Sequence, residues 1–264
     1  KISRPAEKTT PWYQYRRIFM DDKRINNGVA FYRQHQKVLH EAYEKYGVPA
    51  AIIVAIIGVE TRYGKVMGND KVITALATIG FDYPKREAFF SKELRAFLQM
   101  AAEEQFDPLT PMGSYAGAMG MAQFMPSSYL NFAVDYEGDG KRDLWKNPND
   151  AIFSIANYLQ QHGWQRDGLI VDEAVLFNPY TGKHGHKPFT TLGELHSIGV
   201  FSKQHISSDD TRVGYLVLDG EHGELPLITF NNFATITTYN TSPLYAMAVA
   251  ELSRAIEAKR QATP

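Results

Sequence analysis

One glutamate stands at the end of the most apolar stretch of the chain. Residues 50–59 contain no charged side chain, and Glu60 follows them directly in the sequence ETRYG (60–64). A carboxyl group placed among apolar side chains is desolvated, which raises its pKa and favours the protonated form that a general acid needs. The alternative is a glutamate at a helix end that pairs with Arg62 or with a lysine in solvent. Glu60 is therefore the first candidate for acid–base chemistry.

Two further segments combine glycines, amides and aromatic rings. The sequence GAMGMAQFMPS (117–127) has glycines that let the backbone approach a ligand, and its Gln123 both donates and accepts hydrogen bonds. The sequence YNTSPLY (239–245) places Asn240 between two tyrosines, an arrangement that suits stacking on sugar rings and hydrogen bonding to them. Each segment alone also fits a structural role, as a turn into a Met-rich helix or as a helix-capping start.

In their order and separations, these three segments resemble the motifs of the membrane-bound lytic transglycosylase B family of peptidoglycan lytic transglycosylases, soluble periplasmic forms included. The resemblance covers residues 10–258. It implies cleavage of the β-1,4 bond between N-acetylmuramic acid and N-acetylglucosamine, with the muramyl 6-hydroxyl attacking C1 to leave a 1,6-anhydro end. It also implies that the protein is located in the bacterial periplasm. It leaves open whether the full-length form is attached to the outer membrane by a lipid anchor. Because the sequence begins at Lys1 without an apolar leader, we expect a mature or trimmed form.

The resemblance implies that Glu60 is the only catalytic carboxyl group. Glycosidases ordinarily use two carboxyl groups, but the three segments contain no second acidic residue. We therefore expect Glu60 to act first as acid and then as base, with the acetamido group of the substrate stabilising C1. No cofactor is expected for catalysis. The resemblance implies that Gln123 and Asn240 orient the sugar and that Ser114 lies near Glu60. The aromatic side chains expected to form walls that hold the sugar are Phe124, Tyr158, Tyr239 and Tyr245.

A fourth segment has the spacing of a calcium-binding loop. Counted from Asp135, positions 1, 3, 5 and 9 are acidic, position 6 is glycine and position 7 offers a main-chain carbonyl. Position 12 is Lys146 instead of glutamate, so Asp150 at position 16 would close a longer loop, as in some members of the resembling family. Clustered acidic side chains repel one another unless a cation lies among them, although an acidic surface turn is the common alternative. The predicted ligands of a structural Ca²⁺ are Asp135, Glu137, Asp139, Lys141, Asp143 and Asp150.

The elements that must position these segments can be predicted from the spacing of apolar residues. Helices are expected over about 31–46, 50–60, 85–106, 148–162 and 244–258. Gly47 is the expected C-terminal cap of the first of these, and Asn149 or Asp150 the N-terminal cap of the fourth. Short β-branched and aromatic runs predict strands within 169–177, 192–201, 213–218 and 225–230.

The fold class expected from this order is α+β, mainly α. The resemblance implies a lysozyme-like helical core with an adjoining helical lobe and a small β-rich lobe. The predicted boundaries are 1–47 and 80–112 for the helical lobe, 48–79, 113–167 and 227–264 for the core, and 168–226 for the β-rich lobe.

Composition excludes several classes of function. A net charge of −1 provides no general attraction for nucleic acid, and the absence of cysteine excludes disulfides and thiolate metal sites. The longest apolar run, residues 50–59, is half the roughly 20 residues that a transmembrane helix needs. The expected partners are peptidoglycan glycan strands, with other cell-wall enzymes as further candidates, and neither nucleic acid nor a transmembrane segment is expected.

Two other functions stay open on the sequence alone. A hydrolytic muramidase would use the same fold, because a fold does not decide the chemistry. The lack of an evident second carboxyl group argues against it. A non-catalytic peptidoglycan-binding protein is the other alternative, and the intact Glu60, Gln123 and Asn240 argue against that one.

Overall fold

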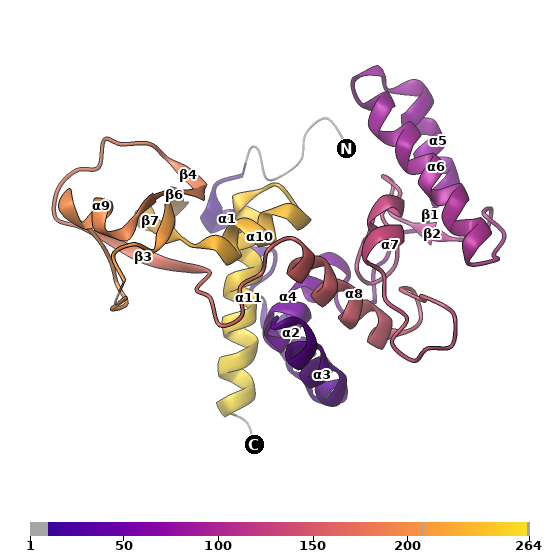
Figure 1. The fold of residues 1–264 in the computed structure, drawn as a ribbon, viewed down its shortest axis with the longest axis horizontal. Coiled ribbons are helices and arrows are strands. Elements are labelled where there is room, and N and C mark those ends of the chain that lie inside the picture. The colour runs from indigo at the N-terminus through magenta and orange to yellow at the C-terminus, as the bar shows by residue number, and fades with distance from the viewer. Residues whose placement is uncertain (1–9, 207, 263–264) are drawn as a thin grey trace. The chain divides into compact units, whose positions relative to one another are not determined.

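The structure is a computed structural model that describes residues 10–206 and 208–262. Two compact units make up the chain (Figure 1). The first comprises Lys1–Asp22, described from residue 10, and Leu159–Ala255, and the second comprises Lys23–Tyr158 and Ile256–Pro264, described to residue 262. Helices α8 (Pro148–Gln161) and α11 (Pro243–Ala262) contribute residues to both.

The second unit is almost entirely helical, and α4 (Ala50–Thr61) is its most buried helix. Residues 52–58 of α4 are all buried, which explains why its sequence is apolar on every side. Gly47, with a φ of 73°, ends α3 (Gln36–Tyr46) as predicted, and Pro49 directly precedes α4. The other elements are α2 (Asp22–Gln34), β1 (Asp70–Lys71), α5 (Val72–Asp82), η2 (Pro84–Arg86), α6 (Glu87–Glu103), β2 (Met112–Gly113) and α7 (Pro126–Phe132).

Within the described ranges, no single helix is long and apolar enough to cross a membrane. Helices α3 and α4 taken together are long and apolar enough for a membrane span by length and composition. The chain bends by 113° between them.

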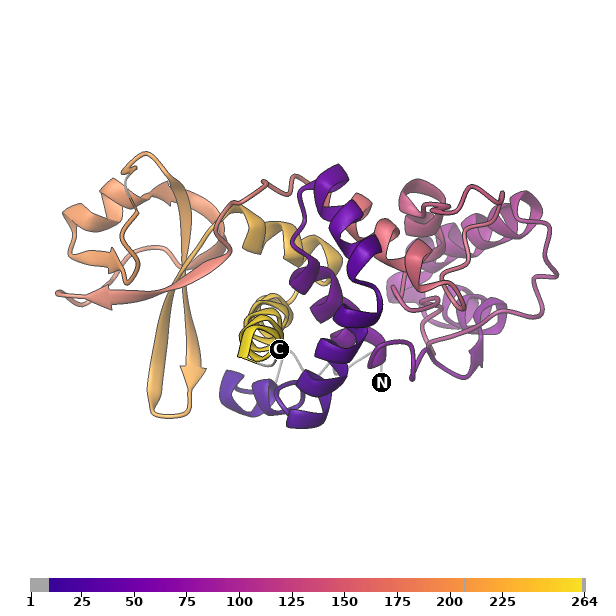
Figure 2. The ribbon, with the colours of Figure 1, turned by 90° about the horizontal axis from the view of Figure 1, so that it is seen from below.

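The first unit contains a five-stranded antiparallel sheet with the strand order β4-β6-β7-β3-β5. Strands β6 and β7 form a long hairpin, drawn in orange in Figure 2, which is paired from Gly214 and Thr229 to Gly220 and Gly223. Leu192 and Leu195 of α9 pack with sheet residues in a small apolar core. The elements of this unit are α1 (Trp12–Arg17), β3 (Val171–Leu176), β4 (Gly185–Thr191), α9 (Leu192–Ser197), β5 (Val200–Ser202), β6 (Arg212–Gly220), β7 (Gly223–Thr229), α10 (Asn231–Tyr239) and most of α11.

The predicted fold class is confirmed, since the described residues are mainly helical, with one five-stranded and one two-stranded sheet. The strands predicted near 169–177, 213–218 and 225–230 correspond to β3, β6 and β7. The strand predicted over 192–201 is wrong for most of its length. Thr191 and Glu194 form a reciprocal capping box that starts α9, so that only Val200–Ser202 is extended. Strand β4 was not predicted; it contains Pro188 and lies at the sheet edge, where proline is tolerated.

One predicted helix cap is also corrected. The first turn of α8 is capped by the side chain of Asn147, which accepts a hydrogen bond from the backbone N–H of Asn149 at 3.0 Å. The side chains of Asn149 and Asp150 do not act as the cap. Asp150 instead accepts hydrogen bonds from the backbone of Tyr136 and Asp143. The division into three lobes stays a prediction; the two compact units divide the chain after Asp22, Tyr158 and Ala255.

Candidate active site

Glu60 lies half-buried, one residue before the end of α4. The chain turns sharply after the helix, because Arg62, Tyr63 and Gly64 all adopt left-handed backbone conformations with φ values of 51°, 62° and 78°. Such values are uncommon for residues other than glycine and are retained where the surroundings fix them. The backbone N–H of Arg62 donates to the carbonyl of Gly58 and that of Tyr63 to the carbonyl of Ile57, each at 3.2 Å. The helix end that carries Glu60 is therefore closed by its own backbone.

Thr61 joins this helix end to the glycine-rich segment 117–127. Its buried hydroxyl lies 3.1 Å from the carbonyl oxygen of Ile57 and 3.2 Å from that of Met121, and it accepts a hydrogen bond from the backbone N–H of Gly64 at 3.0 Å. Because Met121 belongs to the segment that carries Gln123, the residue next to Glu60 is tied to the second sequence motif.

Tyr63 fixes the same turn to α2. Its hydroxyl donates to the carbonyl oxygen of Arg24 at 2.9 Å, and the buried guanidinium of Arg24 donates to the carbonyl of Gly58 at 3.1 Å. A Cβ atom on Gly58 would lie 2.6 Å from the Tyr63 hydroxyl, so glycine is needed there for the ring to pack. A cation at the C-terminal end of a helix is also electrostatically favourable. The turn after Glu60 is thus held by side chains on two other segments.

Gln123 is held in an unusual conformation within its loop. Its φ is 49°, and its side-chain amide donates to the carbonyl oxygens of Gly120 at 2.8 Å and Met67 at 3.3 Å. Among the residues that the structure describes, none donates a hydrogen bond to Gln123 Oε1. The amide orientation is therefore set by the protein, and its oxygen is the atom that can accept from a ligand.

Ser114 belongs to the same group of loops. Its Oγ accepts hydrogen bonds from the backbone of Ala116 at 3.2 Å and Ala118 at 3.0 Å, which closes a tight turn. A Cβ on Gly68 would lie 1.9 Å from the carbonyl oxygen of Gly113, so the loop that follows Glu60 passes directly over the backbone beside Ser114. Glu60, Ser114 and Gln123 therefore lie on three segments of one unit that contact one another.

The predicted aromatic residues lie in two places. Phe124 and Tyr158 belong to the second unit and are buried, with ring centroids 5.6 Å apart. Tyr239 and Tyr245 belong to the first unit and have nearly parallel rings, with an angle of 6° and centroids 6.4 Å apart. Between them in sequence, Asn240 accepts a hydrogen bond from the backbone of Ser242 at 3.1 Å. The substrate-binding roles of all seven residues stay predictions.

Two buried charged residues near these segments were not predicted. One is Arg24, described above. The other is Glu93 of α6, whose two carboxylate oxygens accept hydrogen bonds from the Ser127 backbone at 2.8 Å and the Ser127 hydroxyl at 2.7 Å. Glu93 thereby anchors the end of the segment that carries Gln123. A signal for it exists in the sequence, because Glu93 falls at the same helical spacing as the buried Phe90 and Phe97.

Three of the predicted calcium ligands come together. Carboxylate oxygens of Asp135, Glu137 and Asp150 lie within 4.8 Å of one another. Asp150 is only 1% exposed, and this burial raises its pKa to about 6 although backbone N–H groups of Tyr136 and Asp143 oppose the shift. A divalent cation would relieve the repulsion within this group, and oxygen ligands of this kind suit Ca²⁺.

The other predicted ligands have different partners or untested roles. Asp139 accepts from the backbone of Lys141, and Asp143 accepts from the backbone of Trp145 and Lys146, each at 2.9 Å. These bonds shape the loop, while one carboxylate oxygen on each side chain is available for other contacts. The participation of Asp139, Lys141 and Asp143 in a calcium site stays a prediction.

Comparison with known proteins identifies the family. A family profile described as "Transglycosylase SLT domain" matches residues 1–254. The membrane-bound lytic murein transglycosylase B of Escherichia coli K12 is 43% identical over 261 residues, which cover 98% of this chain and 71% of that protein. The crystal structure of the soluble lytic transglycosylase SltB1 from Pseudomonas aeruginosa is similar with a TM-score of 0.92 and 46% identity, over 98% of this chain and 87% of that one.

The Escherichia coli lytic transglycosylase Slt35, whose structure was solved in complex with calcium, is similar with a TM-score of 0.90 and 43% identity, over 96% of this chain and 81% of that one. Both the match along the sequence and the shared fold extend over nearly the whole chain. The family inferred from the three motifs is confirmed: the chain belongs to the transglycosylase SLT domain family and is a lytic murein transglycosylase, a lyase that acts on peptidoglycan.

Proposed function

We propose that this enzyme cleaves the β-1,4 bond between N-acetylmuramic acid and N-acetylglucosamine with Glu60 as its single acid and base, and that it leaves 1,6-anhydromuramic acid ends. The observation that supports this most is the placement of Glu60 at the end of the buried helix α4, on a turn fixed by Thr61 and Tyr63. A proton-transferring group must be held within hydrogen-bond reach of its target, and such a turn provides the rigidity.

The first step breaks the glycosidic bond. The carboxylic acid of Glu60 donates its proton to the glycosidic oxygen, the electrons of the C1–O bond pass to that oxygen, and N-acetylglucosamine leaves with a 4-hydroxyl group. The carbonyl oxygen of the muramyl acetamido group forms a bond to C1 in its place. This internal participation replaces the second carboxylate of ordinary glycosidases.

The second step closes the anhydro ring. Glu60, now a carboxylate, removes the proton of the muramyl 6-hydroxyl, O6 bonds to C1 and the acetamido oxygen leaves. Glu60 ends the cycle protonated, and no water is consumed. For the 6-hydroxyl to compete with water the sugar must be held closely, where an effective molarity of about 10⁵ M or more becomes available.

Gln123 and Ser114 are proposed to orient the sugar at this site. The fixed amide of Gln123 presents its oxygen as a hydrogen-bond acceptor, which suits the N–H of the acetamido group. Roles for Phe124, Tyr239, Asn240 and Tyr245 in binding the glycan rest on the resemblance of their motifs to those of the family. The role of Tyr158, which lies outside the motifs, rests on its ring contact with Phe124.

Two further statements belong to this proposal. A structural Ca²⁺ is held by Asp135, Glu137 and Asp150, with oxygens of Asp139, Lys141 and Asp143 completing the shell; the proximity of the three carboxylates and the calcium complex of Slt35 support it. The ion stabilises the loop and takes no part in the reaction. The enzyme acts in the periplasm on glycan strands, which the murein in its relative's name supports, and other cell-wall enzymes are candidate partners.

Mass spectrometry of the muropeptides released from purified peptidoglycan tests the reaction. We expect products one water lighter than their reducing-end counterparts, lost in Glu60→Gln and retained in Glu44→Gln, which changes an exposed glutamate of α3. Reducing ends would show a muramidase instead. Binding of peptidoglycan without any product would show a non-catalytic binding protein, and full turnover by Glu60→Gln would reject Glu60 as the acid.

A further inference from the structure

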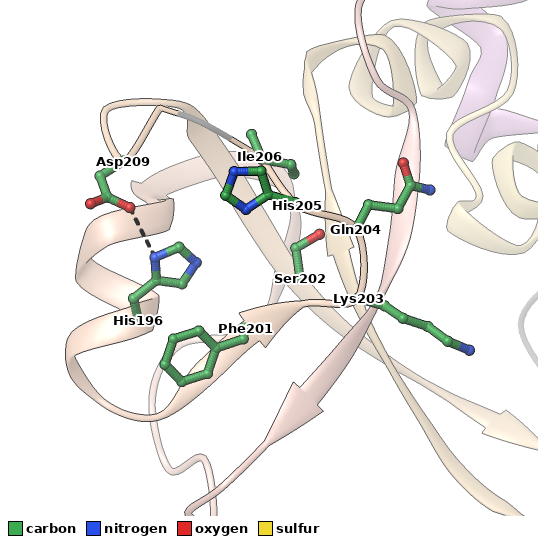
Figure 3. Close-up of a pocket in the computed structure, with 8 residues that line it drawn as sticks. All are labelled: His196, Phe201, Ser202, Lys203, Gln204, His205, Ile206 and Asp209. Atoms are coloured by element: carbon green, nitrogen blue, oxygen red, sulfur yellow. Dashed lines mark hydrogen bonds and ion pairs between the residues drawn. The ribbon is translucent and has the colours of Figure 1, made fainter.

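A pocket of about 560 Å³ opens beside β5, which is one of the two edge strands of the five-stranded sheet in the first unit. Figure 3 shows its lining: His196 from α9, Phe201 and Ser202 from β5, and His205 and Asp209 from the segment that follows. None of these residues takes part in the steps proposed above. The volume falls within the range of about 300–1,000 Å³ that is usual for sites that bind small molecules.

Aromatic rings at this corner of the sheet are unusually exposed. The imidazole of His196 stacks on Phe201 with an angle of 14° and centroids 4.8 Å apart, and Phe177 meets Phe201 edge to face at 5.5 Å. Phe177 is 74% exposed and Phe201 is 38% exposed, and Val175, which pairs with Phe201 across the strands, is exposed as well. Exposed apolar side chains that are scattered singly need no explanation, but a contiguous group of them often marks a binding site.

Polar groups that can form hydrogen bonds with a ligand face the same pocket. Nδ1 of His196 is held by Asp209 Oδ1 at 2.9 Å, and Figure 3 shows the other ring nitrogen directed into the pocket near His205 and Ser202. Because the Ser202 hydroxyl donates to Asp172 at 2.5 Å, its oxygen can accept a hydrogen bond from a ligand. The imidazole held by a carboxylate has a fixed orientation and presents a defined nitrogen to whatever binds.

The charges around the pocket select the class of ligand. Lys203 forms an ion pair with Glu173 at 2.7 Å, and Asp172 and Asp209 add two further carboxylates. This excess of acidic groups disfavours an anion. Exposed aromatic faces beside imidazole, hydroxyl and carboxylate groups instead suit a neutral saccharide, whose C–H faces stack on rings while its hydroxyl and amide groups form hydrogen bonds.

We propose that this pocket binds a saccharide unit of the murein glycan, in addition to the residues that act on the scissile bond. The inference rests on the proposed action on that glycan, which offers the same disaccharide many times along one strand. A second binding site on a repeating polymer raises the effective concentration of the strand at the enzyme without adding to the chemistry. The pocket therefore increases retention on polymeric murein and leaves the turnover of short fragments unchanged.

The test measures retention in a catalytically silent background. Glu60→Gln protein is mixed with purified sacculi and the bound fraction is measured by co-sedimentation, with and without the added pair Phe201→Ala and His205→Ala. We expect the pocket pair to weaken binding about 100-fold, at the lower end of the range that linking two sites gives. The control pair Leu169→Ala and His222→Ala removes an exposed apolar side chain and an exposed histidine of the same unit, and should not change binding.

Two further measurements decide what occupies the pocket. Peptide-free glycan strands, which an amidase releases from sacculi in soluble form, should show the same loss of affinity when binding is measured by titration in solution. Enzyme with intact Glu60 that carries the pocket pair should cleave a soluble tetrasaccharide at the normal rate. The proposal would be overturned if the protein with the pocket pair bound as tightly as the protein with the control pair. It would also be overturned if the loss of binding disappeared when the peptides were removed. Slower cleavage of the tetrasaccharide would also overturn it. Mass spectrometry of wild-type products reports independently on the proposed reaction.

Discussion

The hydroxyl of Thr61 lies 3.2 Å from the carbonyl oxygen of Met121, and this contact joins the residue after Glu60 to the loop that carries Gln123. The two segments are 60 positions apart in the sequence. Thr61 also accepts from the backbone of Gly64, so one side chain organises both the turn after the helix and its attachment to the second motif. We therefore expect Thr61 to act by positioning Glu60.

Thr61→Val tests this role, because valine keeps the shape and removes the hydroxyl. We expect the free energy of unfolding to fall by about 1–3 kcal/mol, since the amide of Gly64 and the carbonyl of Met121 lose a buried partner. Because the acid is displaced and the sugar contacts are not removed, kcat should fall more than KM rises. Denaturant unfolding measures the free energy of unfolding, and steady-state kinetics on a soluble peptidoglycan fragment give kcat and KM.

The matched control is Thr181→Val, which removes the hydroxyl of an exposed threonine in the first unit. It should leave stability and kcat unchanged. A Thr61→Val protein that loses stability but keeps its kcat would show a purely structural role and contradict the positioning of Glu60.

Gly58→Ala is expected to destabilise the protein although alanine favours helix. The new Cβ would lie 2.6 Å from the hydroxyl and 2.8 Å from Cζ of Tyr63, so the ring must move. Overpacking of this kind costs about 1–3 kcal/mol. Since Tyr63 holds the turn after Glu60, kcat should fall as well.

A double-mutant cycle with Tyr63→Phe separates this clash from other effects. Phenylalanine removes the oxygen nearest the new Cβ and also the hydrogen bond to Arg24. We expect the unfolding free energies of the two substitutions to be non-additive, with the double variant more stable than their sum predicts. Additive effects would mean that the Cβ does not meet the Tyr63 hydroxyl.

The sequence was most informative where a local pattern decides the structure. The apolar run before Glu60 predicted the buried α4, and Gly47 predicted the end of α3. Local rules failed where a stronger local signal was overlooked: the strand predicted at 192–201 starts as a helix because Thr191 and Glu194 form a capping box that is readable in the sequence.

Contacts between distant segments could not be predicted in this way. The bond between Glu93 and Ser127 joins α6 to the end of the Gln123 loop, and the bond between Tyr63 and Arg24 joins the Glu60 turn to α2. Spacing along the chain shows which residues share a face of one helix, but it does not show which loop that face meets. The positioning of Glu60 depends on contacts of this second kind.

Removal of calcium should lower the melting temperature. Asp135, Glu137 and Asp150 lie close enough to repel one another, and an ion that binds only the folded state stabilises it by about 2.7 kcal/mol at a hundred times its Kd. We expect a chelator to lower Tm and added Ca²⁺ to restore it, with turnover per folded molecule unchanged. Asp135→Asn should abolish the calcium-dependent shift and Asp219→Asn, at an exposed position of β6, should retain it. An unchanged Tm across millimolar Ca²⁺ would remove the site.

We expect the folded protein to lose stability in mild acid because of His186 in β4. Its burial, with a smaller contribution from the charge of Lys187, lowers the pKa of the imidazole below its usual value of about 6.5. The unfolded chain therefore takes up a proton at a higher pH than the folded protein does, so the free energy of unfolding decreases as the pH falls below about 6.5. His186→Gln removes this proton uptake, and the difference in unfolding free energy between pH 7.5 and pH 5 should be smaller than in the wild type.

Denaturant unfolding at the two pH values measures that difference. His222→Gln, at the exposed end of the β6–β7 hairpin, provides the control and should keep the wild-type difference. The main-chain carbonyl of His186, which accepts from Thr229 at 3.1 Å, is retained in the variant, so the sheet pairing does not confound the comparison. If His186→Gln and the wild type lose the same stability in acid, the decrease comes from other groups and the imidazole titrates alike in the folded and unfolded chain.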